Sequence, residues 1–150
     1  PPLRPPADAL ACLAALADGT ADAIATDHAP HTEVDKLVEF GDAVNGISGI
    51  ETALGLVLAA VDAGQLSLAT AIAALTVGPA RIVGRQRAFV EGAPADLVVF
   101  DRSDRWRVEP GELASKGKNT PVLGRELPGR VLLTMAAGRV AYEAPALVSA

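Results

Sequence analysis

The sequence predicts an α/β chain that combines the C-terminal part of a (β/α)8 TIM-type barrel with strands of a small β-sandwich domain. Residues 1–84 are predicted to contain a helix, a strand, a loop and further helices, an order that matches the last βα units of a barrel. Residues 85–150 show mainly strand patterns and predict a C-terminal β-rich domain. A complete barrel needs about 250 residues, so we expect the barrel portion of this 150-residue chain to be incomplete.

The first helix and the first strand are predicted near the N-terminus. Pro5 and Pro6 precede a helix over residues 7–17, and Gly19 follows as a stop signal. Residues 22–26 form a short apolar run, which predicts a buried strand. A charged loop is expected from residue 32 to about residue 45.

Further helices are predicted between residues 48 and 84. Ser48 and Glu51 have the Ser-x-x-Glu spacing of a capping box. The helix that follows ends at Gly64, and Ser67 is expected to cap the next one. Residues 79–84 add a short helical turn. The apolar face of the first of these helices repeats at helical spacing and comprises Ile50, Ala53, Leu54, Val57, Leu58 and Val61.

Strand patterns dominate the remainder. Residues 95–101 predict a buried strand, and residues 129–143 predict two strands joined by a tight turn at Ala137 and Gly138. The only tryptophan, Trp106, is expected to pack between the β-rich region and the barrel portion.

Composition excludes several classes of protein. The net charge is −5 and no block of basic residues is present, which argues against nucleic-acid binding. The longest apolar stretch, residues 50–63, contains Glu51 and Asp62 and is too short to span a membrane. The single cysteine, Cys12, excludes a disulfide framework and agrees with a cytoplasmic location. We expect Cys12 to be a core residue of its helix.

Asp27, His28 and His31 are the residues best suited to chemistry. They follow the predicted strand directly, and residues in that position face the active site of a βα barrel. The aspartate could bind a divalent metal and accept a proton from water, and His31 could bind a metal or an anion. The alternative is a polar turn in which Asp27 caps the next segment and both histidines are solvated; spacing alone favours this alternative.

Residues 25–31, Ala-Thr-Asp-His-Ala-Pro-His, resemble the TDHAPH signature of dihydroorotases, which belong to the amidohydrolase superfamily. Further resemblances occur in the family's order and cover nearly the whole chain. They are Pro1-Pro2-Leu3-Arg4 to NPPLR, residues 18–24 to DGTID-I, residues 46–51 to G-I-x-G-x-E, residues 75–80 to LT-x-NPA, residues 95–98 to ADLV, and residues 118–124 to KxxNTPFxG.

The resemblance implies roles for four residues. Asp27 matches the aspartate that binds a metal and acts as general base and acid. His31 matches the histidine that binds a substrate carboxylate, and Asn45 and Gly46 match the loop whose backbone contacts the dihydroorotate ring. His28 is expected to support the site without ligating metal.

The implied cofactor is Zn2+, one or two ions per full-length subunit, in a site that this chain can only partly form. The family's HxH pair, its carboxylated lysine and two later histidines are absent, and Lys36, Lys116 and Lys118 lie outside the required context. Within the matching motifs, Val122 replaces a phenylalanine, Asn45 a bulky apolar residue and Gly78 an asparagine.

The resemblance therefore implies a fragment of an enzyme that interconverts N-carbamoyl-L-aspartate and (S)-dihydroorotate, the third step of pyrimidine synthesis. The chain alone is expected to have little activity. Two alternatives stay open: another cyclic amidohydrolase, such as a dihydropyrimidinase or an allantoinase, or a non-catalytic partner of aspartate carbamoyltransferase. The expected partners are the small-molecule substrate, further copies of the full-length protein and the transferase, with no nucleic acid and no membrane.

Overall fold

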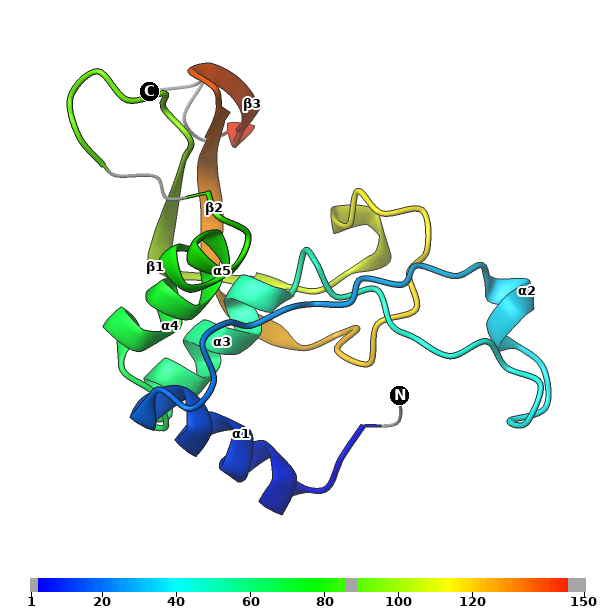
Figure 1. Cartoon of the computed structure of the whole chain (residues 1–150). Coiled ribbons are helices and arrows are strands. Elements are labelled where there is room, and N and C mark those ends of the chain that lie inside the picture. Colours follow the sequence, from blue (N-terminus) through cyan, green and yellow to red (C-terminus); the bar gives the residue numbers. More distant parts are fainter. Residues whose placement is uncertain (1–2, 86–88, 146–150) are drawn as a thin grey trace.

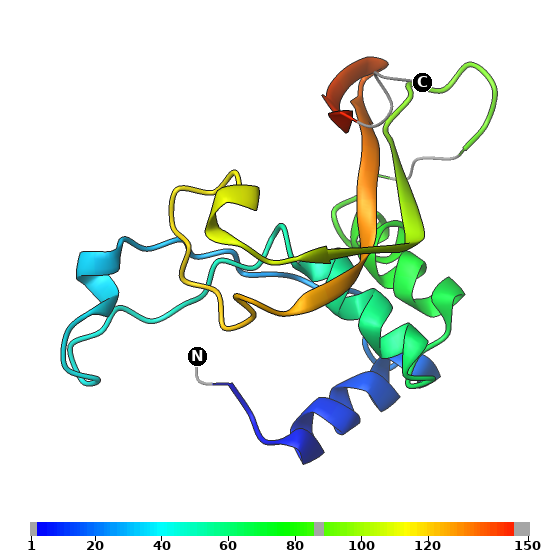
Figure 2. The ribbon, with the colours of Figure 1, turned by 180° about the vertical axis from the view of Figure 1, so that it is seen from behind.

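The computed structural model of the chain describes residues 3–85 and 89–145. The helices are α1 (Pro6–Asp18), α2 (Glu33–Lys36), α3 (Ala53–Asp62), α4 (Leu68–Leu75) and α5 (Val77–Ile82), with a 3-10 turn at Pro110–Glu112; the strands are β1 (Leu97–Arg107), β2 (Glu126–Ala136) and β3 (Arg139–Glu143). Helices α3, α4 and α5 group beside the sheet, and α1 lies beyond them (Figure 1). Helix α2 lies at the tip of a long arm formed by residues 19–52. Figure 2 shows the same arm from behind, alongside the loop between β1 and β2.

Helix α1 confirms the predicted first helix. It starts at Pro6 and ends before Gly19, which adopts the left-handed conformation with φ 82°. None of its residues is buried, and Leu10 is 56% exposed. The expectation that Cys12 belongs to a core is therefore wrong, because this thiol is exposed.

The predicted strand at residues 22–26 is not a strand in this structure. Among the described residues, the only sheet consists of β1, β2 and β3, and residues 22–26 do not join it. The backbone N–H of Ile24 instead donates to the carbonyl of Ala74, at the end of α4, at 2.9 Å. The apolar pattern is present at residues 22–26, but a strand also needs a neighbouring strand that pairs with its backbone N–H and carbonyl groups.

A short helix interrupts the predicted charged loop. Thr32 and Asp35 form a capping box, in which the Asp35 N–H donates to Thr32 Oγ1 at 3.3 Å and the Thr32 N–H donates to Asp35 Oδ2 at 3.0 Å. The Thr32 hydroxyl also donates to Asp35 Oδ2 at 2.6 Å. The two hydrogen bonds that Asp35 Oδ2 accepts, first the one from the Thr32 side chain and then the one from the Thr32 N–H, hold the pKa of Asp35 below its usual value.

Helix α3 begins later than the sequence predicts, and the predicted capping box is wrong. The helix starts at Ala53, after Thr52, whose side chain makes no capping hydrogen bond. The Glu51 carboxylate instead accepts hydrogen bonds from the distant backbone N–H groups of Ala114 at 2.6 Å and Ser115 at 2.9 Å. Glu51 therefore binds the backbone N–H groups of Ala114 and Ser115 instead of capping the N-terminus of α3 as the local spacing predicts.

The next two helices confirm the sequence prediction closely. Ser67 Oγ accepts from the Thr70 N–H at 3.0 Å and caps α4. Helix α5 then spans Val77–Ile82, within two residues of the predicted helical turn at 79–84.

The sheet is antiparallel with the order β1-β2-β3. Strand β1 is longer than predicted, because it continues past Asp101 to Arg107 through a break in register. The predicted turn between β2 and β3 is confirmed: Ala137 has φ 49° and Gly138 has φ 78°, positive at both positions as a type I′ hairpin requires.

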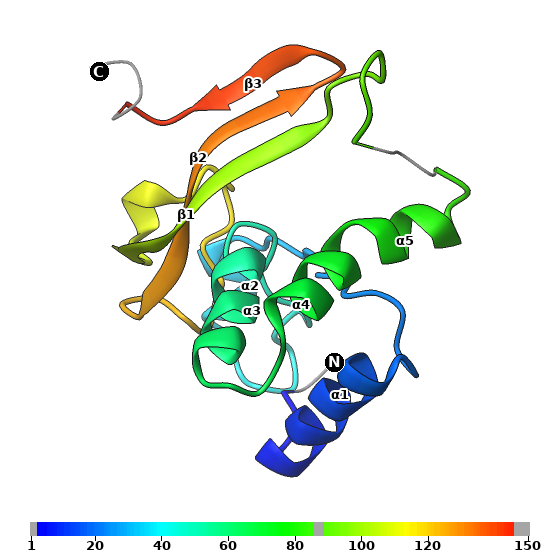
Figure 3. The ribbon, with the colours of Figure 1, turned by 90° about the vertical axis from the view of Figure 1, so that its left-hand side faces the viewer.

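Helix α3 packs closely against β2 through two glycines, and Figure 3 shows this helix next to the sheet. A Cβ added at Gly55 would lie 2.9 Å from the Leu127 Cβ, and one added at Gly129 would lie 2.3 Å from the Leu58 Cδ1. Leu58 is fully buried and Leu127 is 1% exposed. Because neither glycine has a side chain, the backbones of α3 and β2 can approach each other closely.

A second apolar cluster lies at the far end of the sheet. It consists of Val108, Leu113, Val122 and Leu127, and the half-buried Trp106 packs against it. Trp106 packs against apolar side chains as predicted, but the predicted place between the β-rich region and the barrel portion is not observed, because the cluster lies entirely within residues 85–150.

Across residues 3–85 and 89–145, every helix is too short or too polar to cross a membrane.

Replacement of Gly129 tests the close packing of α3. We expect Gly129→Ala to lower the free energy of unfolding by about 2–4 kcal/mol, because overpacking against buried Leu58 and a Cβ at positive φ both destabilise. Urea unfolding measures the loss. Gly111→Ala is the control, since no atom lies within 4 Å of its added Cβ and its φ is not positive. Equal midpoints for the two variants would contradict the packing argument.

Asp62 gives the contact between α3 and β1 a pH dependence. Its two carboxylate oxygens accept hydrogen bonds from Arg102 at 3.0 Å and Arg105 at 2.9 Å. The Arg102 hydrogen bond is the largest cause that lowers the pKa of Asp62. Because the pKa is lower in the folded state than in the unfolded chain, the ion pairs stabilise the fold above the unfolded value of about 3.9, and this stabilisation is lost as the pH falls through the lower folded value.

We therefore expect Asp62→Asn to lower the thermal midpoint at neutral pH and to change it less at the most acidic pH at which the protein stays folded. Asp42→Asn, at an exposed aspartate without an ion pair among the described residues, serves as the control. A loss from Asp62→Asn that is equal at both pH values would argue against these ion pairs.

Candidate functional site

Asp27 has an accessible carboxylate on a strained backbone. Its side chain is exposed and makes no hydrogen bond or ion pair with the part of the chain that the structure describes. Its φ is 44°, in the left-handed region, which costs an L residue about 1–2 kcal/mol. The predicted alternative, in which Asp27 caps the following segment, is wrong, because Thr32 caps α2.

Hydrogen bonds on both sides hold the Asp27 backbone in place. Before it, the Ile24 N–H donates to the carbonyl of Ala74 at 2.9 Å; after it, the Ala29 N–H donates to the carbonyl of Ile47 at 2.9 Å. A strained conformation persists when the surrounding structure fixes it in this way. The carboxylate is thus presented by the fold and left without a structural partner.

His28 supports the chain immediately before α3. Its Nδ1 accepts from the backbone N–H groups of Gly49 at 3.2 Å and Ile50 at 3.3 Å, and the residue is half-buried. Because both partners are donors, Nδ1 carries no hydrogen. This contact supports the predicted supporting role of His28.

His31 lies against the loop at residues 45–46. Its Nε2 donates to the carbonyl oxygen of Asn45 at 2.9 Å, which leaves Nδ1 without a partner among the described residues. The side chain is half-buried, so the predicted solvated histidine is not observed. The structure brings together three of the four predicted site residues: His31, Asn45 and Gly46.

Gly46 can only be glycine at this position. An added Cβ would lie 2.6 Å from the Ala29 Cβ and 3.4 Å from His31 Nε2, and the φ of Gly46 is 116°. The absence of a side chain therefore allows the loop to lie directly on the segment that carries Asp27 and His31.

Two residues that the sequence did not assign to the site hold its loops together. Asn119 makes three hydrogen bonds, to His31, Ala29 and Gly46. Lys36 Nζ donates to the carbonyls of Val44 at 2.5 Å and Gly46 at 2.7 Å. The sequence pattern Lys-Asn-Thr-Pro marks Asn119 as part of a motif that resembles the family's, but it does not indicate a role in the site.

The predicted residues do not form a complete metal site. No group of three or more His, Cys, Asp or Glu side chains that could hold a metal is found in residues 3–85 and 89–145. A catalytic zinc site uses three protein ligands and an open position. Asp27 could contribute one oxygen ligand to a metal held mainly by other residues.

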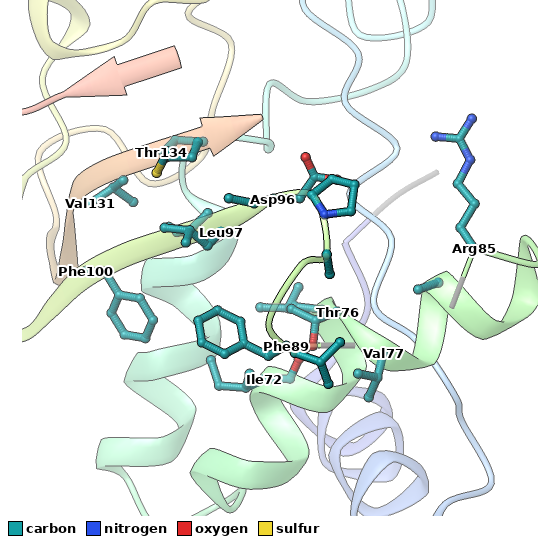
Figure 4. Close-up of a pocket in the computed structure, with 18 of the residues that line it drawn as sticks. Ile72, Thr76, Val77, Arg85, Phe89, Asp96, Leu97, Phe100, Val131 and Thr134 are labelled. Atoms are coloured by element: carbon teal, nitrogen blue, oxygen red, sulfur yellow. Dashed lines mark hydrogen bonds between the residues drawn. The ribbon is translucent and has the colours of Figure 1, made fainter. Parts of the chain in front are cut away.

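An apolar cavity lies in a different part of the molecule. Its volume is about 1210 Å3, and Figure 4 shows Ile72 and Thr76 of the helical side with Leu97, Phe100 and Val131 of the sheet. None of Asp27, His31, Asn45 and Gly46 lines it. The candidate site therefore lies on the arm, at Asp27, His31, Asn45 and Gly46, and is separate from this cavity.

The chain is similar to known proteins in both sequence and structure. The chain is 51% identical over 144 residues to a dihydroorotase of Anaeromyxobacter dehalogenans and 47% identical over 145 residues to one of Citrifermentans bemidjiense. These matches cover 95% and 96% of this chain but 33% and 34% of the two relatives. The chain thus spans about a third of the length of the curated relatives that it matches.

Solved structures of proteins named hydantoinases also match most of this chain. A D-hydantoinase (dihydropyrimidinase) from Thermus sp. matches with a TM-score of 0.86 and 29% identity, and an L-hydantoinase (dihydropyrimidinase) from Arthrobacter aurescens with 0.85 and 30%. Both matches cover 95% of this chain and 33% of the solved chain. The model of the amidohydrolase family matches residues 5–142, which is most of the sequence, and the chain therefore belongs to the amidohydrolase family.

Proposed function

We propose that the chain is part of a dihydroorotase, which interconverts N-carbamoyl-L-aspartate and (S)-dihydroorotate. One observation carries the proposal: a free Asp27 carboxylate stands on the same loop as His31, which is hydrogen-bonded to Asn45 beside Gly46. Relatives named dihydroorotase match 95% of the chain at 46–51% identity, which supports this substrate class.

The proposed architecture follows from the same relationship. Residues 1–84 would be the last βα units of an incomplete TIM-type hydrolase barrel, and residues 85–150 would contribute strands to a small β-sandwich domain. The helices of the first part and the antiparallel sheet of the second support this division. The close contact of α3 with β2 means that the two parts would pack as neighbours.

Zn2+ is the cofactor that we propose for the full-length enzyme, with one or two ions per subunit. The described residues of this chain do not fit a complete zinc centre, because they supply Asp27 and no group of three ligands. The remaining ligands would come from the rest of the protein.

Asp27 is proposed as the residue that moves the proton. Its carboxylate would take a proton from the attacking water and deliver it to the ring nitrogen that leaves when the amide opens. A carboxylate held in a fixed backbone conformation, with no other hydrogen-bond partner, is free to do both. In the cyclising direction the same atom would act in reverse.

His31, Asn45 and Gly46 are proposed to bind the substrate. His31 would hold its carboxylate, and the backbone at Asn45 and Gly46 would contact the ring. Such contacts fix the reacting amide relative to Asp27 and lower the entropic cost of the reaction. The direct contact between His31 and Asn45 supports a shared subsite.

A hydantoinase or dihydropyrimidinase activity is the second candidate, and the two structural matches at 29–30% identity favour it. A substrate profile of the full-length protein separates the two activities, because dihydroorotate carries a carboxylate and dihydropyrimidines do not.

We also propose a cytoplasmic location, a homo-oligomer, and aspartate carbamoyltransferase as a candidate partner. Co-purification with the transferase from a protein that lacks turnover would favour a non-catalytic role.

The purified 150-residue chain is expected to have little or no dihydroorotase activity with added zinc, because its described residues hold no three-ligand metal group. The assay is dihydroorotate turnover at saturating substrate. Robust turnover that Asp27→Asn abolishes would show that the chain completes a site by itself.

In the full-length protein that contains this chain, Asp27→Asn should lower kcat by about 10²–10⁴-fold, the usual contribution of a general acid or base. The thermal midpoint should not fall, since Asp27 makes no stabilising side-chain contact within the described residues. Asp42→Asn is the matched control. A loss of less than about tenfold would remove the proton-transfer role from Asp27.

A further inference from the structure

Asn119 uses its whole side-chain amide to join two distant segments. Its Oδ1 accepts from the backbone N–H of His31 at 2.8 Å. Its Nδ2 donates to the carbonyls of Ala29 at 3.0 Å and Gly46 at 3.2 Å. The first segment carries Asp27 and His31, and the second carries the loop at residues 45–46.

The partners fix the orientation of this amide. A backbone N–H can only donate and a backbone carbonyl can only accept, so exchanging the oxygen and nitrogen of Asn119 would break all three hydrogen bonds. Asparagine is therefore the residue whose acceptor and two donors match these three groups.

The loop that carries Asn119 is itself held firmly. The carbonyl of Asn119 accepts from the Ser48 N–H at 3.1 Å, and the Glu51 carboxylate binds the N–H groups of Ala114 and Ser115. Gly117 lies so close to the arm that an added Cβ would be 2.6 Å from the backbone nitrogen of His31. Because the loop backbone is held in place, the Asn119 side chain can set the position of His31.

Lys36 also binds the Gly46 carbonyl that Asn119 binds. Its Nζ donates to the Gly46 carbonyl at 2.7 Å, so this one oxygen accepts from both Lys36 and Asn119. The ammonium group holds the loop end, while the Asn119 side chain connects that end to the His31 backbone.

We propose that Asn119 is a positioning residue that holds His31 in register with the loop at residues 45–46 and thereby sets the affinity for the substrate carboxylate and ring. The substrate part of this inference rests on the proposed function. The Asn119 amide is engaged with three backbone groups, so Asn119 would act through His31 and the loop rather than on the substrate itself. Its loss should therefore weaken binding of substrate and transition state alike, which raises KM and leaves kcat nearly unchanged.

The experiment uses Asn119→Ala and Asn119→Asp in the full-length protein that contains this chain. KM should rise about tenfold or more with kcat within about threefold, because three hydrogen bonds are lost. Asn119→Asp should be at least as impaired, since it keeps the size but turns a carboxylate oxygen toward the carbonyls of Ala29 and Gly46.

Hydrogen exchange tests the same contact without any turnover. The His31 amide hydrogen, which Asn119 Oδ1 accepts, should exchange at least about tenfold faster in Asn119→Ala, because its direct acceptor is gone. Ser67→Ala is the control: it removes the cap of α4, and its effects should stay within that helix.

Faster His31 exchange together with a raised KM would support the proposal. Unchanged His31 exchange would overturn it, as would a fall in kcat at constant KM, or a KM that rises equally in Ser67→Ala. If the unmodified protein fails to turn over dihydroorotate, the proposed function is wrong, and the exchange measurement still decides whether Asn119 positions His31.

Discussion

Two long irregular segments, residues 19–52 and 108–125, satisfy many of their backbone polar groups through side chains. A buried N–H or carbonyl without a partner costs about 1–3 kcal/mol, so segments without a regular ladder need partners from elsewhere. Asn119, Lys36, Glu51 and His28 provide them, each at two or more backbone groups. The path of the arm, and thus the place of the candidate site, depends on these four side chains.

Glycines make this arrangement sterically possible. Gly46 and Gly117 stand where backbone meets backbone around His31, and Gly129 stands where β2 meets α3. The loop between β1 and β2 reaches the site through Gly117 and Asn119, which lie against the His31 backbone. Residues 85–150 therefore contribute to the geometry of the site, although the residues proposed for chemistry all lie in residues 1–84.

The sequence predicted those features that depend on near neighbours. Helix α1, the Ser67 cap and the turn at Ala137 and Gly138 each follow from a few consecutive residues, and all three are confirmed. The strand at residues 22–26 and the Ser48–Glu51 capping box were wrong, because distant backbone groups decide both outcomes. Asn119 was missed as a site residue for the same reason: its three partners lie 73 to 90 positions away.

The state of Asp27 also follows from distant contacts. An aspartate in a turn tolerates the left-handed region mainly by binding a nearby backbone N–H with its side chain. Here the hydrogen bonds of Ile24 and Ala29 hold the chain on either side, and the next cap is taken by Thr32. The carboxylate thus has no local partner among the described residues, although its backbone is held on both sides. Backbone outliers that the surrounding structure fixes cluster at functional sites, and this supports the proposed acid-base role of Asp27 over that of a polar turn.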